Sequence, residues 1–382
     1  MWHAVLDFSA LKRYNIQGLI SATKEEIIMK KKIAMLLTAA MVLGLVGCAQ
    51  TETQAPAATE EAKTEETVEE APEAEATEEE ATKAPAEAAA SYTIGVCQLV
   101  EHPALDAATQ GFMDAVTAEL GDAVSFDVQN AQGDSNTCST IINSFVSNNV
   151  SLILANATPA LQAAAAGTNE IPILGTSVTE YGVALDIDNF SGTVGGNISG
   201  TSDLAPLDKQ ADIFTELLPD VKKVGLVYCS AEANSQYQVD VVKECLEGKG
   251  IECELYAFAD SNDLSAVATS AANECEALYV PTDNTVASNA EIIQNICLPA
   301  GIPVVAGEEG ICGGCGIATL SISYYDLGTA TGKMAVKVLK GEANISEMPI
   351  EYAPEFTKKY NAANCEALGI KVPDDYVAIE AE

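Results

Sequence analysis

The chain has 382 residues and a formal net charge of −37, from 56 acidic and 19 basic side chains. Apolar residues make up 48% of it, which is enough for a sizeable core and excludes a wholly disordered chain. The charge excludes nucleic acid as a partner, because such binding needs a basic surface that replaces phosphate counterions. Length alone allows two or three domains.

The N-terminus has the pattern of a lipoprotein export signal. A positively charged segment at 29–32 precedes the apolar stretch 33–46, which at about 1.5 Å per residue is too short to cross roughly 30 Å of hydrocarbon. It fits a signal-peptide core. Leu45-Val46-Gly47-Cys48 then resembles a bacterial lipobox. We predict a signal peptide at 29–47, lipidation of Cys48, and an upstream extension of the reading frame at 1–28.

Residues 51–90 consist almost entirely of Ala, Glu, Thr and Pro, and include 13 Glu. Proline interrupts any helix there, and no apolar face is available for packing. We expect 48–90 to be the lipidated cysteine and an acidic disordered tether, with a helical stalk as the alternative. A folded body at 91–376 follows.

The body alternates apolar strands with amphipathic helices. In its first half we expect strands at 93–98, 124–128, 151–155 and 171–175, and helices at 103–120, 135–147 and 159–166. After a glycine-rich passage at 192–200 the pattern restarts. There we expect strands at 224–228, 252–258, 277–280, 302–306 and 317–323, helices at 207–218, 235–247, 264–274, 286–298 and 325–339, an extended run at 349–353 and a short helix at 361–368. This is an α/β fold with two similar lobes of doubly wound parallel sheet. Ligands of such folds bind beyond the carboxyl ends of the strands.

Six segments, in order along the body, resemble the ABC-transporter substrate-binding lipoproteins of the tryptophan/tyrosine (aromatic amino acid) binding family. They are 94–106 (IGVCQLVEHPALD), 198–203 (ISGTSD), 228–235 (YCSAEANS), 279–285 (YVPTDNT), 306–310 (AGEEG) and 323–328 (SYYDLG). The resemblance implies the type I periplasmic-binding-protein fold, with two lobes joined by three crossovers. It also implies discontinuous lobes, one at about 92–198 and 322–343 and the other at about 199–321 and 344–376.

An amino-acid ligand presents a carboxylate, an ammonium group and a side chain. The only arginine and the only tryptophan, Arg13 and Trp2, lie outside the body, so backbone N–H groups and hydroxyls must hold the carboxylate. We predict Thr158, Ser177 and Thr179 for that role, with helix capping as the alternative.

For the ammonium group we predict Asp283 first and Glu308 second, against the alternative of solvated charges. The rim of the cleft should include Gln98, Glu101, Ser202, Asp203, Glu232 and Asn234. Tyr181 and Tyr324 are candidates for stacking on an aromatic ligand. His102, the only histidine of the body, is expected to be a structural hydrogen-bonding residue.

Ten cysteines follow Cys48. We expect Cys97, Cys253 and Cys275 to be small core residues. Cys312 and Cys315 form a C-x-x-C in a glycine-rich loop between strands, where we expect a local disulfide or two free thiols. A second cysteine pair at zinc-site spacing is absent from the sequence.

The sequence has no Walker A lysine motif, nucleophile elbow or H-E-x-x-H, so we predict no cofactor, no metal and no catalysis. The expected function is capture of a small solute, an aromatic amino acid by resemblance, for an ABC permease and ATPase at the outer face of the cytoplasmic membrane. The alternatives are a sugar or nucleoside carrier of the same fold, an extracytoplasmic sensor domain, and a redox enzyme that uses Cys312 and Cys315.

Overall fold

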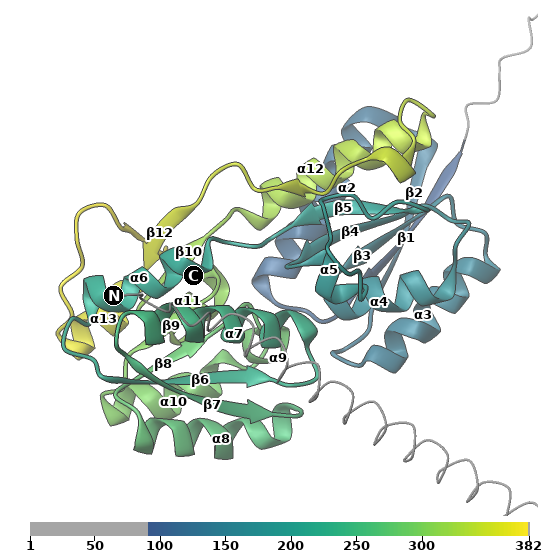
Figure 1. The fold of residues 1–382 in the computed structure, drawn as a ribbon. Helices are drawn as coiled ribbons and strands as arrows, with labels where there is room; N and C mark the ends of the chain where they lie inside the picture. Colours follow the sequence, from purple (N-terminus) through teal and green to yellow (C-terminus); the bar gives the residue numbers. More distant parts are fainter. Residues whose placement is uncertain (1–90, 381–382) are drawn as a thin grey trace, which may run out of the picture. The chain divides into compact units, whose positions relative to one another are not determined.

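The computed structural model describes residues 91–380 (Figure 1). The predicted extension, signal peptide, lipidated Cys48 and tether lie outside the described residues. Within 91–380, no helix is both long and apolar enough to cross a membrane. The described chain forms two sheets, each covered by helices on both faces.

The first sheet is parallel, with the strand order β11-β5-β4-β3-β1-β2. Its strands are β1 (Tyr92–Gln98), β2 (Val124–Asn130), β3 (Leu152–Asn156), β4 (Ile173–Val178), β5 (Ile198–Ser202) and β11 (Glu351–Tyr352). Its helices are α2 (Pro103–Leu120), α3 (Ser135–Ser147), α4 (Thr158–Gly167), α5 (Tyr181–Ala184) and α12 (Tyr324–Leu339), with short 3-10 turns at Gly121–Ala123 and Ile345–Glu347. We call this unit the first lobe.

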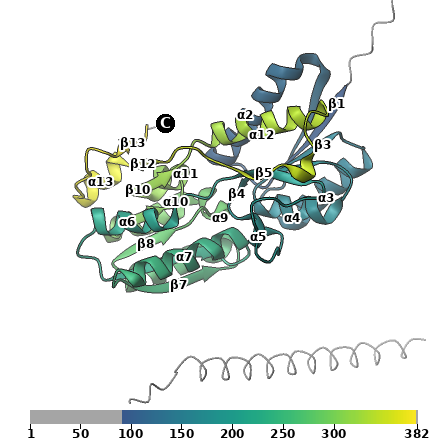
Figure 2. The ribbon, with the colours of Figure 1, turned by 45° about the horizontal axis from the view of Figure 1, so that its top comes forward.

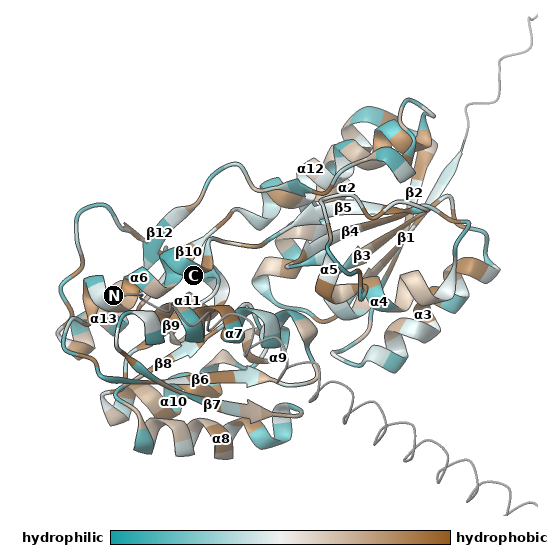
Figure 3. Ribbon diagram, viewed as in Figure 1, coloured by the Kyte–Doolittle hydropathy of each residue, from teal (hydrophilic) through white to brown (hydrophobic). Residues whose placement is uncertain are grey.

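Alternate side chains of each buried strand pack on opposite faces of this sheet, as the period of a strand requires. Ile94 and Val96 of β1 pack with Phe112 of α2 and Met334 of α12. Cys97 packs on the other face in a cluster that includes residues of α3 and α4. In Figure 3 the central strands β1, β3 and β4 are coloured mainly as hydrophobic, as expected for strands that are buried on both faces.

The second sheet has the order β13-β12-β10-β9-β8-β6-β7, and only the pair β10–β12 is antiparallel among its described pairings. Its strands are β6 (Lys223–Cys229), β7 (Glu252–Phe258), β8 (Ala277–Val280), β9 (Val304–Ala306), β10 (Ala318–Ser321), β12 (Thr357–Tyr360) and β13 (Val377–Ala378). Its helices are α6 (Leu207–Leu217), α7 (Ala233–Gly248), α8 (Ser261–Glu274), α9 (Asn284–Ala287), α10 (Ala290–Ala300), α11 (Glu309–Cys315) and α13 (Ala362–Leu368). We call this unit the second lobe.

The chain passes between the two sheets three times: after β5 at 203–206, after β10 at 322–323, and after β11 at 353–356. Figures 1 and 2 both show these connecting segments. This is the predicted type I periplasmic-binding-protein fold. Two segments that the sequence assigned to the second lobe, β5 and β11, pair in the first sheet instead, because β5 adds to β4 and β11 adds to β5.

Several elements differ from the expected ones. The predicted helix at 286–298 is two helices, α9 and α10, separated at Ser288 and Asn289. The Gly-rich segment around Cys312 and Cys315 is not a loop but helix α11. Four further elements, α5, β5, β12 and β13, were not predicted from the sequence.

Glycines let α2 and α12 pack against each other in the first lobe. A Cβ atom at Gly328 of α12 would collide with the backbone carbonyl of Ala108 in α2, and one at Gly111 would collide with the carbonyl of Tyr325. A Cβ atom at Gly332 would lie 2.7 Å from the carbonyl oxygen of Phe112. Side chains larger than hydrogen at these positions would force the two helices apart.

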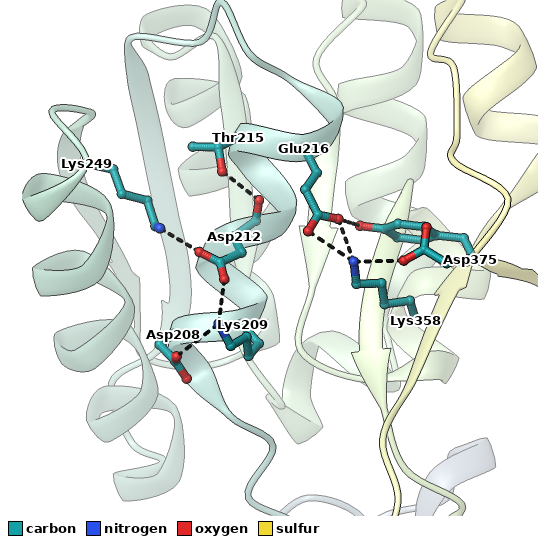
Figure 4. A network of polar contacts seen from close by, with 9 residues as sticks. Asp208, Lys209, Asp212, Thr215, Glu216, Lys249, Lys358 and Asp375 are labelled. Atoms are coloured by element: carbon teal, nitrogen blue, oxygen red, sulfur yellow. Dashed lines mark hydrogen bonds and ion pairs between the residues drawn. The ribbon is translucent and has the colours of Figure 1, made fainter.

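An ion-pair network ties the C-terminal segment to α6 (Figure 4). Lys358 of β12 pairs with Glu216 at 2.8 Å and with Asp375 at 3.1 Å. The hydroxyl of Tyr376 donates to Glu216 Oε2 at 2.7 Å, and Lys358 Nζ lies 5.1 Å from the centre of the Tyr376 ring. These side chains are partly exposed, so each pair contributes at most about 1 kcal/mol, but together they fix the segment that follows the third crossing.

Candidate ligand-binding site

A small polar cavity lies where the carboxyl ends of the strands of both lobes meet. It has a volume of about 10 Å³, room for about one water molecule. Its lining residues are His102, Leu105, Ser177, Thr179, Asp203, Asn234, Thr282, Asn284 and Tyr324. We call it the polar cavity. Five of these residues were predicted site residues: Ser177, Thr179, Asp203, Asn234 and Tyr324.

The position of each lining residue follows from the order of the strands. His102 follows β1, Ser177 and Thr179 lie at the end of β4, and Asp203 follows β5. Asn234 lies in the first turn of α7 after β6, and Asn284 opens α9 after β8. Parallel strands bring their carboxyl ends to one edge of a sheet, so residues far apart in sequence meet here.

Four residues of the polar cavity carry a buried polar atom that has no hydrogen-bond partner among the described residues. The atoms are Nδ1 of His102, Oγ of Ser177, Oδ1 of Asp203 and Oδ1 of Asn234. A buried polar atom without a partner costs about 1–3 kcal/mol, so such atoms are rare in folded proteins. Their concentration in one cavity marks it as a place where a polar ligand group would be stabilised.

Asp203 is the acidic residue of this cavity. It is 5% exposed, and its Oδ2 accepts a hydrogen bond from the Tyr324 hydroxyl at 3.0 Å. Burial raises the pKa of the Asp203 carboxyl above its ordinary value. Burial and the neighbouring Asp203 also raise the pKa of Tyr324, so the tyrosine remains a hydrogen-bond donor. Asp203 Oδ1 is a buried acceptor that has no hydrogen-bond donor among the described residues.

Asp203 is one of four buried acids of the described chain that were predicted site residues. Asp203, Glu232, Asp283 and Glu308 are all buried. Among residues 91–380 no lysine is buried, and the sequence has no arginine there. A positive charge that enters the polar cavity would consequently meet the Asp203 carboxyl without competition from a buried cationic side chain of the described residues.

Ser177 has a backbone conformation that serine rarely adopts. Its φ is 54°, in the left-handed region. Such conformations cost of order 1–3 kcal/mol and cluster at ligand sites, where the surrounding structure holds them. Here the strain coincides with a buried hydroxyl that has no partner, which is what a hydroxyl reserved for a ligand requires.

Asp283 and Glu308, the two acids predicted to face an ammonium group, are occupied by the backbone. Asp283 accepts from the N–H groups of Cys229 at 2.7 Å and Val286 at 2.9 Å, and so caps α9. Glu308 accepts from the N–H groups of Gly310 and Ile311 and caps α11. Burial raises the pKa of Glu308 to about 7. Burial together with the neighbouring Glu232 raises the pKa of Asp283. Neither acid lines the polar cavity.

Other predicted residues also have structural partners. Gln98 donates to Asp106 at 2.6 Å, the Ser202 hydroxyl donates to the carbonyl of Thr179 at 2.7 Å, and Tyr181 donates to the carbonyl of Thr201 at 2.9 Å. Glu101 is exposed, and Thr158 is buried at the start of α4. None of these five lines the polar cavity.

A larger cavity of about 190 Å³ shares Asn284 with the polar cavity. Its walls include Leu99, Val100 and Pro159 from the first lobe, and Cys229 and Glu232 from the second. Glu232, predicted at the rim, contacts α9: its Oε1 accepts from Thr285 N–H and its Oε2 from Asn284 N–H, both at 3.0 Å. This carboxylate thus holds the start of α9, whose Asn284 lines both cavities.

The cysteines of the described chain are all free thiols. Cys97 and Cys275 are buried, as predicted, and Cys253 is partly buried. Cys312 and Cys315 do lie in a helix that follows a strand, contrary to the expected loop. Both are buried, and burial raises the pKa of each thiol. A redox pair needs an accessible thiol with a lowered pKa, so this environment opposes the redox alternative. No group of residues suited to a metal ion occurs within 91–380.

The comparisons with known proteins agree with this architecture. The family model for ABC transporter substrate binding proteins matches residues 93–382. A tyrosine-binding protein of Clostridioides difficile is 35% identical over 284 residues, which cover 73% of this chain and 81% of the relative.

Two solved structures extend the similarity to three dimensions. The structure of an ABC domain in complex with L-Trp from Streptococcus pneumoniae has 32% identity and a TM-score of 0.71, and covers 75% of this chain and 97% of that one. A ligand-free, open substrate-binding protein with adhesive properties from Clostridium difficile has 36% identity and a TM-score of 0.59, with coverage of 76% and 100%. The chain belongs to the family of ABC transporter substrate-binding proteins.

Proposed function

We propose that this substrate-binding protein captures an L-amino acid with an aromatic side chain between its lobes and delivers it to an ABC permease. Asp203 carries the proposal: this buried carboxyl lines the polar cavity, and among residues 91–380 its Oδ1 has no hydrogen-bond partner and no lysine or arginine is buried. The space holds about one water molecule, which is the size of one ammonium group. The names of relatives that bind tyrosine and L-Trp support the aromatic class.

The rest of the ligand is assigned by chemistry and position. The ligand carboxylate would be held by hydroxyls, with Ser177 and Thr179 as the nearest donors in the polar cavity. The larger cavity, with Leu99, Val100 and Pro159 in its walls, is the adjoining space with apolar surface. An aromatic side chain would extend there, and closure of the lobes would remove it from water. The proposal includes no catalytic step.

The proposal places the protein at the outer face of the cytoplasmic membrane, held through a lipidated Cys48. The support is the charged segment, apolar stretch and lipobox-like sequence at 29–48. Replacing Cys48 with serine should release the protein from membranes into the soluble fraction. Unchanged partitioning into detergent would contradict the anchor but not the ligand-binding proposal.

A thermal-unfolding panel tests the ligand class. The protein is first unfolded and refolded to remove any carried ligand, then heated with tyrosine, tryptophan, phenylalanine, leucine, glucose, ribose or adenosine. At a hundredfold excess over Kd, a ligand adds about 2.7 kcal/mol. At roughly 2 °C per kcal/mol, this raises Tm by about 5 °C. We expect this rise with an aromatic amino acid. A rise with ribose or adenosine and none with any amino acid would favour the sugar or nucleoside alternative.

A further inference from the structure

His102 lines the polar cavity and is therefore a candidate ligand-binding residue. It lies in the short loop between β1 and α2, immediately before the first residue of α2, and is 7% exposed. Its side chain does not cap α2, although it occupies the capping position. The ring instead lines the polar cavity, and its Nε2 lies 3.2 Å from Asn284 Oδ1 in the second lobe.

The contacts of Asn284 determine which ring nitrogen carries the proton. Asn284 Nδ2 donates to Glu232 Oε2 at 2.6 Å, and Oε2 also accepts from the backbone N–H of Asn284 at 3.0 Å. The amide nitrogen therefore faces Glu232 and the amide oxygen faces His102. An amide oxygen can only accept, so His102 Nε2 must be the donor. In a neutral imidazole this leaves Nδ1 as an unprotonated acceptor.

Nδ1 has no protein donor among the described residues, and it shares this condition with two other acceptors of the polar cavity. These are Asp203 Oδ1 and Asn234 Oδ1. The cavity holds about one water molecule, and hence about one ammonium group. An ammonium group has three N–H donors, one for each of the three acceptors.

We propose that His102 Nδ1 accepts a hydrogen bond from the ammonium group of the ligand, beside Asp203 Oδ1 and Asn234 Oδ1, and that Asn284 and Glu232 act as positioning residues that fix this tautomer. The proposal rests on the proposed function, since it assigns a further residue to the same amino-acid site. Burial lowers the pKa of His102, which supports a neutral ring. Because His102 belongs to the first lobe and Asn234 to the second, the ligand would bind both lobes through one group.

Two substitutions at His102 separate ligand binding from the link between the lobes. The amide nitrogen of glutamine reaches approximately the position of Nε2, so His102→Gln keeps a donor for Asn284 and loses the acceptor for the ligand. Asparagine places its oxygen near Nδ1, so His102→Asn keeps the acceptor and loses the link. We expect His102→Gln to weaken binding about tenfold or more, and His102→Asn to bind more tightly than His102→Gln. Equal affinities of His102→Gln and wild type, or the reverse order, would overturn the assignment.

Nitrogen NMR on the full-length protein provides a measurement that needs no substitution at His102. Histidine is labelled with ¹⁵N, and the resonances of His102 are distinguished from those of His3, the other histidine, with His3→Gln. The probe is whichever of L-tyrosine, L-tryptophan and L-phenylalanine binds most tightly by calorimetry. We expect a protonated Nε2 and a bare Nδ1 without ligand, and a shift of the Nδ1 resonance, with Nε2 still protonated, on saturation.

The outcomes distinguish this assignment from the proposed function. Calorimetric binding of an aromatic amino acid with an unmoved Nδ1 resonance, or a proton on Nδ1 before ligand is added, overturns the role of His102 alone. Absence of binding by any amino acid overturns both.

Discussion

The hydroxyl of Tyr324 donates to Asp203 Oδ2 at 3.0 Å and so joins the first connecting segment to the helix that begins directly after the second. Asp203 lies in the first crossing, directly after β5, and Tyr324 is the first residue of α12, directly after the second. Both residues are buried and line the polar cavity. A ligand held by Asp203 Oδ1 would therefore act on the segments about which the lobes move.

Asp203→Asn should abolish most of the ligand affinity and leave the fold intact. Asparagine still accepts from Tyr324 but carries no charge for the ammonium group. Loss of one partner from a desolvated charged pair costs about 2–5 kcal/mol, which is roughly a thirtyfold weakening or more. The measurement is calorimetric titration with an aromatic amino acid. Asp212→Asn, a partly exposed acid of α6 that pairs with two lysines, is the control and should bind like wild type. Wild-type affinity of Asp203→Asn would remove it from the site.

Asp283→Ala should lower stability rather than affinity. The substitution removes the cap of α9 and leaves the buried N–H groups of Cys229 and Val286 without their acceptor. We expect a loss of about 2–4 kcal/mol in the free energy of unfolding, measured by urea denaturation. A large loss of affinity at unchanged stability would return the ammonium group to Asp283.

Glu308 should make the folded protein less stable as the pH rises from about 4.5 to about 7. Its pKa is raised from an ordinary 4.5 to about 7, so the folded state binds more protons than the unfolded state in this window. This contribution is fully present below the unfolded pKa and is lost as the pH rises through the folded pKa, with a total on the order of 2–3 kcal/mol. Glu308→Gln should flatten the pH dependence of the unfolding free energy across this window. An unaltered slope would show that Glu308 titrates normally.

Gly328→Ala should destabilise the first lobe severely. Its Cβ would overlap the carbonyl of Ala108, which is backbone and cannot rotate away, so α2 and α12 must separate. We expect a loss of at least 2 kcal/mol by urea denaturation, in the range of overpacked cores. Gly248→Ala is the matched control: this glycine ends α7, and an added Cβ meets no atom within 4 Å. It should be neutral or slightly stabilising. Equal stabilities of the two variants would contradict the close packing.

Most helices and strands could be predicted because their apolar residues recur with a clear helical or strand period. The helix at 135–147 and the strands at 252–258 and 277–280 have the predicted bounds. Strand β5 was missed because its sequence, Ile198-Ser-Gly-Thr-Ser, is short and polar and contains Gly200 at a φ of 150°. The segment is a strand because it pairs with β4 and β11 on either side. Helix α11 was missed because three of its seven residues are glycine, and the cap by Glu308 compensates for their low propensity.

The general location of the site could also be predicted, since strand ends mark the cleft. The sequence could not distinguish Asp283 from Asp203, because both are acids that follow strands. Their difference lies in hydrogen bonding: backbone N–H groups occupy both oxygens of Asp283, whereas Asp203 retains a bare Oδ1. His102 was expected to be structural because no partner for a lone histidine is visible in sequence. Its partner, Asn284, lies 182 residues away.

Calorimetric titration of the refolded full-length protein with L-tyrosine and L-tryptophan tests the central claim most directly. The account predicts saturable binding of at least one of them at one site per chain, with a negative heat-capacity change from burial of the aromatic side chain. It also predicts that the α-hydroxy acid of the same side chain, which lacks the ammonium group, binds at least thirtyfold more weakly. Equal affinity for the amino acid and the hydroxy acid, or heat only from sugars and nucleosides, would contradict an ammonium site at Asp203.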